Sequence, residues 1–169
     1  EGAALVTAEY QKLLDEKKMP NIITTCCPAM NDLVEKYYPE CASLMAPVVS
    51  PMIAHGRYIK KLYGDATKVV FLGPCIAKKQ EAEGDERIAG AIDAILTFEE
   101  LALWMKQEGI DPASLEEAPF GNPDPEVNRL YPVSGGVILS VMAEKEDDFY
   151  QKVHVDGLEH CMELLECLK

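Results

Sequence analysis

The stretch KVVFLGPC, residues 68–75, is the most informative about the fold, because a short apolar run ends at a Gly-Pro pair and leads straight into Cys75. Val69 to Leu72 is continuously apolar, which is the pattern of a parallel strand buried on both faces. We therefore expect a short buried strand here, with a cysteine just beyond its carboxyl end.

The same order of strand, cap and helix recurs downstream and upstream of this stretch. DAILT, residues 93–97, leads into TFEE, residues 97–100, which has the form of a capping box and should open a helix that reaches Gly109. Residues 21–25 predict another strand, which ends at Cys26 and Cys27. Three such repeats predict an α/β fold in which a parallel sheet is flanked by helices.

Proline marks the start of two further helices. Pro28 suits the first helical position after Cys27, so we expect Cys27 to be the N-cap of a helix that runs to Tyr38. Ser50 and Pro51 open a helix over residues 52–63 in the same way. A thiolate at a helix N-terminus is stabilised by unpaired amides and by the helix dipole, which makes it a better metal ligand or nucleophile.

The remaining segments complete the expected order of elements. An amphipathic helix is predicted over residues 4–17, and five prolines between residues 111 and 132 indicate a surface excursion. Residues 134–146 predict a helix entered from a glycine turn. Residues 153–169 predict a short strand followed by a helix.

The composition favours one acidic domain that spans residues 1–169. Asp and Glu number 29 against 16 Lys and Arg, and the resulting net charge of -13 would repel a nucleic-acid backbone. The apolar runs are shorter than the ~20 residues of a membrane helix, and the sequence shows no secretory signal. We expect a cytoplasmic chain without membrane insertion, and free or metal-bound thiols rather than disulfides among its six cysteines.

The cysteines fall into two groups. Cys26, Cys27 and Cys75 each follow a predicted strand, and the carboxyl ends of parallel strands border the ligand crevice, so we expect these three thiols to face one crevice. The other three are interpreted as small buried hydrophobic residues: Cys41, Cys161 and Cys167.

Two motifs carry a family resemblance. TTCCP at residues 24–28 and GPCIAKKQE at residues 73–81 resemble the first two signature motifs in the C-terminal domain of the iron-only, or [FeFe], hydrogenase large subunit. YYPE, LTFEELA and VSGGV resemble further segments of that family, so the similarity covers nearly the whole chain. In that family the active centre is the H-cluster, a [4Fe-4S] cubane joined to a two-iron subsite with CO and cyanide ligands. The resemblance implies half of that domain, a Rossmann-like lobe, and hydrogen chemistry in the parent protein.

The resemblance also implies roles for particular side chains. Cys27 and Cys75 match two metal ligands of the cubane, and Cys26 matches the thiol that relays protons to the two-iron subsite. Lys78 matches a lysine that donates a hydrogen bond to a cyanide ligand, and Glu81 would support that lysine or the proton path. Judged without the motif, Lys78 would be a solvated surface lysine.

Further positions match the wall of the cluster pocket, and the glycines among them would let backbone approach a bulky inorganic ligand. Glu9 could align with a proton-path glutamate, although an exposed helix glutamate is the simpler interpretation. The matching wall positions are Ser50, Pro51, Pro74, Ser134, Gly135 and Gly136.

The sequence departs from the family pattern in two ways. The third motif, roughly E-x-M-x-C-x-x-G-C, does not occur in these 169 residues. We therefore expect a truncated form that, with two of four thiolate ligands, holds no cluster by itself and is inactive alone. Several positions also differ in type from those of active enzymes, which favours a divergent, sensor-like member: Met30, Ala46, Val49, Met52 and Gly73.

Three functions follow as hypotheses. The first is an enzyme domain that interconverts dihydrogen with protons and electrons, with a ferredoxin-like carrier as electron partner. The second is a sensor of hydrogen or redox state, whose cluster is read by a signalling domain of the parent protein. The third is a metal-free thiol switch at the Cys26–Cys27 pair. This last hypothesis is the weakest, since adjacent cysteines form a strained disulfide and the Cys75 motif stays unexplained.

Overall fold

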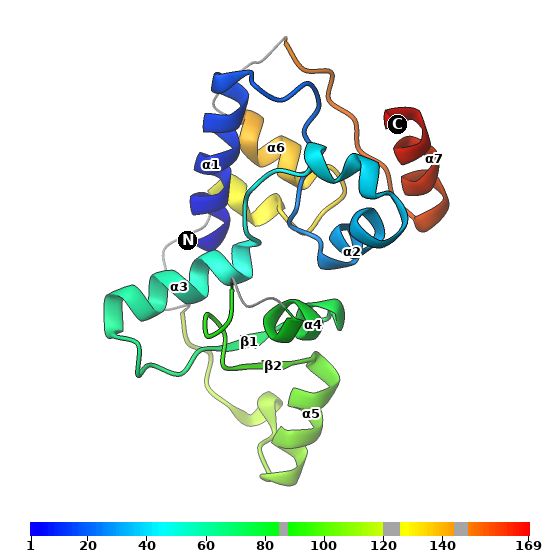
Figure 1. The fold of residues 1–169 in the computed structure, drawn as a ribbon. Coiled ribbons are helices and arrows are strands. Elements are labelled where there is room, and N and C mark those ends of the chain that lie inside the picture. The colour runs from blue at the N-terminus through cyan, green and yellow to red at the C-terminus, as the bar shows by residue number, and fades with distance from the viewer. Residues whose placement is uncertain (85–87, 120–125, 144–148) are drawn as a thin grey trace. The chain divides into compact units, whose positions relative to one another are not determined.

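The computed structural model describes residues 1–84, 88–119, 126–143 and 149–169. It is rich in helices and contains a small parallel sheet (Figure 1). Internal contacts divide the chain into two units, residues 1–55 with 125–169 and residues 56–124, and each is described by itself. None of the helices in the described part of the chain is both long and apolar enough to cross a bilayer.

The first unit consists of helices and connecting loops. The helix predicted at the beginning of the chain is confirmed, as are the two that begin at proline, and the helix after the glycine turn is confirmed up to residue 142. The part of that helix predicted over residues 144–146 lies outside the described residues. The helices are α1 (Gly2–Glu16), α2 (Pro28–Tyr37), α3 (Pro51–Tyr63), which continues into the second unit, α6 (Gly136–Met142) and α7 (Leu158–Leu168), with 3-10 turns η1 (Pro39–Leu44) and η3 (Glu126–Leu130).

Two strands predicted in the first unit are not formed. Residues 21–25 contribute only an isolated parallel bridge between Ile23 and Met45. The ladder stops there because the Thr25 N–H donates to the Tyr10 hydroxyl, and the chain enters α2 at Pro28, which has no N–H to offer. The segment before α7 is irregular, and Val153 in it is exposed, because no strand of the described residues lies beside it to pair with.

Two hydrophobic clusters hold the first unit together. In one, α1 lies along α6 (Figure 1), and the buried side chains are Val6, Tyr10, Ala46 and Val141. In the other, α2 and η1 meet α7, and the buried side chains are Val34, Tyr38, Cys41 and Leu165. The loop that carries Cys26 packs against the first of these clusters.

The second unit contains the sheet. Strand β1 (Val70–Leu72) pairs in parallel with β2 (Ala94–Leu96), and Val70 lies opposite Ala94. Helix α4 (Ala77–Gly84) follows β1, and α5 (Phe98–Gln107) follows β2, as predicted for the helix after the capping box. The 3-10 turn η2 (Pro112–Ser114) comes after them. The capping box is confirmed: the Thr97 hydroxyl accepts from the Glu100 N–H, and the Glu100 carboxylate accepts from the Thr97 N–H.

The predicted burial of β1 on both faces is wrong. Val70 is 52% exposed and Leu72 is 45% exposed. In the described residues the sheet has only two strands, so it is too narrow for helices to cover both faces of β1. Asp93 fixes the beginning of the pair instead, since its side chain accepts from the Val69 N–H at 2.9 Å and its own N–H donates to the Val69 carbonyl at 2.8 Å.

Candidate functional site

The two adjacent cysteines of the first unit have different environments. Cys26 is half-buried against the α1–α6 cluster, whereas Cys27 is exposed. The backbone of Cys27 is extended, with φ -101° and ψ 109°, so successive side chains leave the chain on opposite sides. Cys27 is the N-cap of α2, as predicted, and its side chain makes no capping bond to the amides of α2, all of which the structure describes. Its thiol is therefore available to a ligand.

A buried phenol lies beside Cys26. The Tyr10 oxygen accepts from the Thr25 N–H at 2.8 Å and lies 3.8 Å from the Cys26 sulfur. Burial raises the pKa of Tyr10 above its ordinary value, and the charge of Cys26 raises it further, while the hydrogen bond from the Thr25 N–H opposes the shift. Sequence reasoning missed Tyr10, because its burial and its contact with a residue 16 positions later depend on tertiary packing.

A second phenol shares this neighbourhood. The Thr7 hydroxyl donates to the Asn128 side-chain oxygen at 3.0 Å, and it also lies 3.0 Å from the Tyr131 hydroxyl. Because Thr7 has a single hydroxyl hydrogen, Tyr131 is the donor in its contact with Thr7. Burial raises the pKa of Tyr131 to about 12, and the charge of Cys26 adds to the shift.

The predicted pocket-wall residues of the first unit have identifiable roles within the chain. Ser50 is buried, and its hydroxyl accepts from the Ile53 N–H at the beginning of α3. Pro51 occupies the first turn of that helix, where its carbonyl oxygen leaves no room for a side chain on Gly2. Ser134 is exposed and donates to Asp156 at 2.5 Å. That Ser50, Pro51 and Ser134 line a cluster pocket stays a prediction.

The two glycines of the turn are explained by the chain itself. Gly135 has a φ of 69°, a conformation that favours glycine, and a Cβ there would lie 3.4 Å from the His154 ring. A Cβ on Gly136 would overlap the Leu130 carbonyl oxygen. Contacts within the chain therefore explain both glycines. That their backbone approaches the H-cluster stays a prediction.

The other cysteines of the first unit differ among themselves. Cys41 is fully buried, as predicted, and its thiol donates to the Leu165 carbonyl at 3.8 Å. The prediction for Cys167 is wrong, since this residue is exposed on the solvent side of the last turn of α7. Cys161 is half-buried, and its pKa is raised first by burial and then by the nearby charges of Cys27 and Asp156.

The second unit contains the other predicted group. Cys75 is half-buried, lies two residues before α4, and accepts the Lys78 N–H at its carbonyl at 3.3 Å. The Lys78 ammonium is 2.7 Å from the Glu81 carboxylate, and these side chains are only 13% and 11% exposed. Lys78 is therefore not a solvated surface lysine. Pro74 is exposed at the end of the loop.

The predicted site residues are thus divided between the two units. Cys26 and Cys27 belong to the first unit, and Cys75, Lys78 and Glu81 to the second. Within the described ranges no group of three or more His, Cys, Asp or Glu side chains forms a metal site. The convergence of Cys27 and Cys75 on one crevice stays a prediction. Glu9 is exposed and pairs with Lys12, which fits the simpler interpretation of that glutamate.

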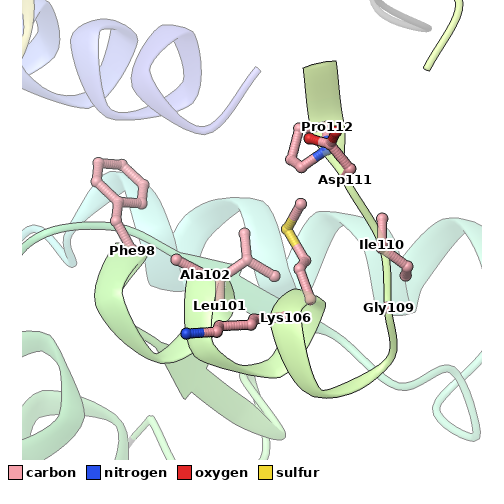
Figure 2. Close-up of a pocket in the computed structure, with 9 residues that line it drawn as sticks. Phe98, Leu101, Ala102, Lys106, Gly109, Ile110, Asp111 and Pro112 are labelled. Carbon is pink, nitrogen blue, oxygen red and sulfur yellow. The ribbon is translucent and has the colours of Figure 1, made fainter. Parts of the chain in front are cut away.

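A separate depression of about 500 Å³ lies in the second unit, between α5 and the turn that follows it. Figure 2 shows its lining of mainly apolar side chains, including Phe98, Leu101 and Ile110. The residues that line it include none of the predicted site residues, so it is distinct from the candidate site.

The chain is similar in sequence to known hydrogenases. The family described as "Iron only hydrogenase large subunit, C-terminal domain" matches residues 1–169. The periplasmic [Fe] hydrogenase large subunit of Nitratidesulfovibrio vulgaris is 34% identical over 150 residues, which cover 78% of this chain and 35% of that protein. Iron hydrogenase 1 of Clostridium pasteurianum is 28% identical over 155 residues, which cover 82% of this chain and 26% of that protein.

Solved structures agree with these sequence matches. An apo variant of [FeFe]-hydrogenase HydA1 from Chlamydomonas reinhardtii superposes with a TM-score of 0.53 at 26% identity, covering 73% of this chain and 33% of that chain. A structure of HydA(deltaEFG) that reveals stepwise H-cluster assembly superposes with a TM-score of 0.50 at 27% identity, covering 73% and 32%. The chain spans about a quarter to a third of the length of these relatives.

Proposed function

The chain belongs to the family defined by the C-terminal domain of iron-only hydrogenase large subunits, and on that premise we propose that its parent protein interconverts dihydrogen with protons and electrons at an H-cluster. The observation that carries this proposal is the pair of adjacent thiols at the beginning of α2. One thiol is exposed at the helix N-terminus and the other is turned toward the core.

The cysteine side chains of this chain fit the iron–sulfur part of the H-cluster that the family implies. Thiolates are the ligands of iron–sulfur clusters, and Cys27 offers an exposed thiol at an N-cap, where the amides of α2 favour an anionic ligand. Cys75 offers a second, half-buried thiol beside α4. The bound cluster would supply the electron-transfer and hydrogen chemistry. Cys26, on the other side of the chain from Cys27, would hold and pass a proton at its sulfur.

Lys78 and Glu81 would provide a fixed hydrogen-bond donor. The ammonium is nearly excluded from water and is oriented by the carboxylate one turn later in α4. A lysine held in this way can donate to an anionic acceptor such as a cyanide ligand without first being ordered. The buried pair supports this role over that of a mobile surface lysine.

The partners and the location form part of the proposal. We propose a ferredoxin-like carrier as the electron partner, or a signalling domain of the parent protein that reads the state of the cluster, with dihydrogen and protons as small substrates. We also propose a cytoplasmic location. Immunodetection in separated cytoplasmic and periplasmic fractions of the source cells tests that location, and a periplasmic signal would contradict it.

A second candidate function is a hydrogen- or redox-sensing domain. It is favoured by Ala46 and Met52, which are both buried and apolar at positions where the resemblance implies polar residues in active enzymes. A sensor would bind the same cluster but turn over slowly. Hydrogen uptake and evolution rates of the whole parent protein therefore separate the two functions.

The ligand assignment is tested by anaerobic reconstitution with iron and sulfide and then with a two-iron precursor that already carries CO and cyanide, followed by iron analysis and infrared spectroscopy. In the parent protein we expect CO and cyanide bands, whereas we expect the 169-residue chain alone to be inactive. Cys27→Ala and Cys75→Ala should each abolish cubane assembly, while Cys26→Ala should leave the cubane in place and stop proton transfer. Cys167→Ala is the matched control, because it removes an exposed thiol outside the site. Iron binding that survives Cys75→Ala would contradict the proposal.

A further inference from the structure

We propose that Tyr10 is a positioning residue for Cys26, whose thiol hydrogen is held on the Tyr10 phenolic oxygen. The inference rests on the proposed function, in which Cys26 is the thiol that passes protons. It concerns the neighbour that fixes this thiol, which the resemblance does not supply. Tyr10 and Cys26 belong to the same unit, and their hydroxyl and sulfur are 3.8 Å apart.

A count of the hydrogens around Thr25 assigns the donors. The Thr25 N–H donates to the Tyr10 oxygen at 2.8 Å. The single hydroxyl hydrogen of Thr25 is directed to main-chain carbonyls, at 2.5 Å to Val48 and 3.2 Å to Ala46. Since a carbonyl can only accept, the Thr25 oxygen has no hydrogen left for Tyr10, and in their 3.3 Å contact Tyr10 must be the donor.

The same count assigns the donor in the contact between Tyr10 and Cys26. Its hydroxyl hydrogen can point to the Thr25 oxygen at 3.3 Å or to the Cys26 sulfur at 3.8 Å. Oxygen is the better acceptor and is closer, so the hydrogen goes to Thr25. One lone pair of the Tyr10 oxygen stays open after the Thr25 N–H is bound, and the Cys26 S–H fills it. Every hydrogen of this group then has an acceptor.

The surroundings allow Tyr10 to hold the thiol in one orientation. Tyr10 is 3% exposed and Thr25 is 6% exposed, so water does not compete for these bonds. Ala46, which is apolar where the resemblance implies a polar residue in active enzymes, contributes its carbonyl to this group. The Tyr131 hydroxyl is nearby but donates to Thr7, as the bond from Thr7 to Asn128 requires. Tyr10 is thus the phenol that contacts the sulfur of Cys26.

The S–H stretching band of Cys26 tests this assignment in the cluster-free 169-residue chain. The band lies in a region of the infrared spectrum where proteins otherwise absorb little, and it moves to lower wavenumber when the thiol donates a hydrogen bond. The difference between wild type and Cys26→Ala identifies it. We expect the band to shift to higher wavenumber in Tyr10→Phe, which lacks only the hydroxyl, and to keep its position in the control Tyr131→Phe. An unshifted band in Tyr10→Phe overturns the inference.

Wild-type protein provides a second measurement that does not depend on how Tyr10→Phe folds. The thiol of Cys41 donates to the Leu165 carbonyl, and its band is identified from Cys41→Ala. The Cys26 band should lie near the Cys41 band and below that of a small alkyl thiol in an apolar solvent. A Cys26 band at the position of the free alkyl thiol overturns the inference.

The reconstituted parent protein then separates this inference from the proposed function. Tyr10→Phe should slow the exchange of dihydrogen with deuterated water by on the order of tenfold or more, with unchanged CO and cyanide bands, while Tyr131→Phe should alter neither. If those bands form in no variant, the proposed function fails while the S–H result still decides the Tyr10 assignment. An unchanged exchange rate in a folded, cluster-loaded Tyr10→Phe overturns the role of Tyr10 in positioning the relay thiol.

Discussion

Lys78 and Glu81 form an ion pair across one turn of α4, with 2.7 Å between the ammonium nitrogen and a carboxylate oxygen, and both side chains are almost excluded from water. An exposed pair at the same spacing exists in α1, where Lys12 and Glu9 are 66% and 54% exposed. The two pairs share the three-residue spacing, although lysine comes first in α4 and glutamate first in α1, and they differ in burial. Comparing them therefore tests how burial changes the contribution of such a pair to stability.

Glu81→Gln should lower the free energy of unfolding by about 2–3 kcal/mol, because the buried ammonium loses its carboxylate partner. Glu9→Gln should change it by less than about 1 kcal/mol, since water screens the exposed pair. Urea unfolding of the two variants measures both values. Equal losses would mean that the burial of the Lys78–Glu81 pair has no energetic consequence.

Asp93 should make the stability of the chain sensitive to acid. Its hydrogen bonds from Lys60, the Val69 N–H and Lys68 hold the pKa of its carboxyl well below the ordinary value of 3.8. The pKa in the folded state is therefore lower than in the unfolded state, so the stabilisation is present above pH 3.8 and is lost as the pH falls below it. Asp93→Asn should be less stable than wild type at neutral pH, and the difference should shrink toward about pH 2. Unfolding curves of the variant and of wild type, recorded at several pH values, measure this difference. A difference in the free energy of unfolding that stays constant as the pH falls would contradict the prediction.

Gly136→Ala should destabilise the chain by about 1–3 kcal/mol, because the added Cβ would overlap the Leu130 carbonyl oxygen. Gly84→Ala is the matched control. Gly84 ends α4, and among the described residues a Cβ there would meet only the Gln80 side chain at 3.9 Å, so we expect a gain of about 0.5 kcal/mol from reduced unfolded-state freedom. Thermal or urea unfolding measures both changes, and a neutral Gly136→Ala would show that the glycine turn can relax.

Tyr131 should ionise late in an alkaline titration. Burial raises its pKa from 10.0 to about 12, so the stabilisation from its neutral phenol is fully present below pH 10.0 and is lost as the pH rises through about 12. The ultraviolet absorbance of tyrosinate, recorded against pH for wild type minus Tyr131→Phe, isolates this group. A difference curve with its midpoint near pH 10.0 would contradict the burial of the phenol.

Sequence predicted best those features whose cause lies within a few residues. The capping box at Thr97, the proline at the first position of α2 and the serine cap of α3 each depend on neighbours three residues away or fewer. The predicted strand at residues 21–25 failed for the opposite reason. A strand needs a partner distant in sequence, and here a tyrosine of α1 takes the amide that a ladder would have used.

In the candidate site, too, features set by neighbouring residues could be predicted and features set by distant residues could not. The position of Cys27 at a helix N-terminus could be read from its neighbour Pro28, and the structure confirms it. The partners of Cys26 could not be read in this way, because Tyr10 lies 16 positions earlier and Tyr131 reaches the neighbourhood through Thr7, 124 positions away. The burial of Lys78 also depends on packing, which local sequence does not specify.

The extended backbone at Cys27 sets a limit on how this segment can change over evolution. Because neighbouring side chains alternate in direction there, the count of residues between the Ile23 bridge and Pro28 determines which thiol meets the protein interior and which meets the outside. Replacing a side chain in this interval alters one contact, whereas a single-residue insertion or deletion would exchange the two sulfurs. Natural variants of this segment should therefore accumulate substitutions but keep its length.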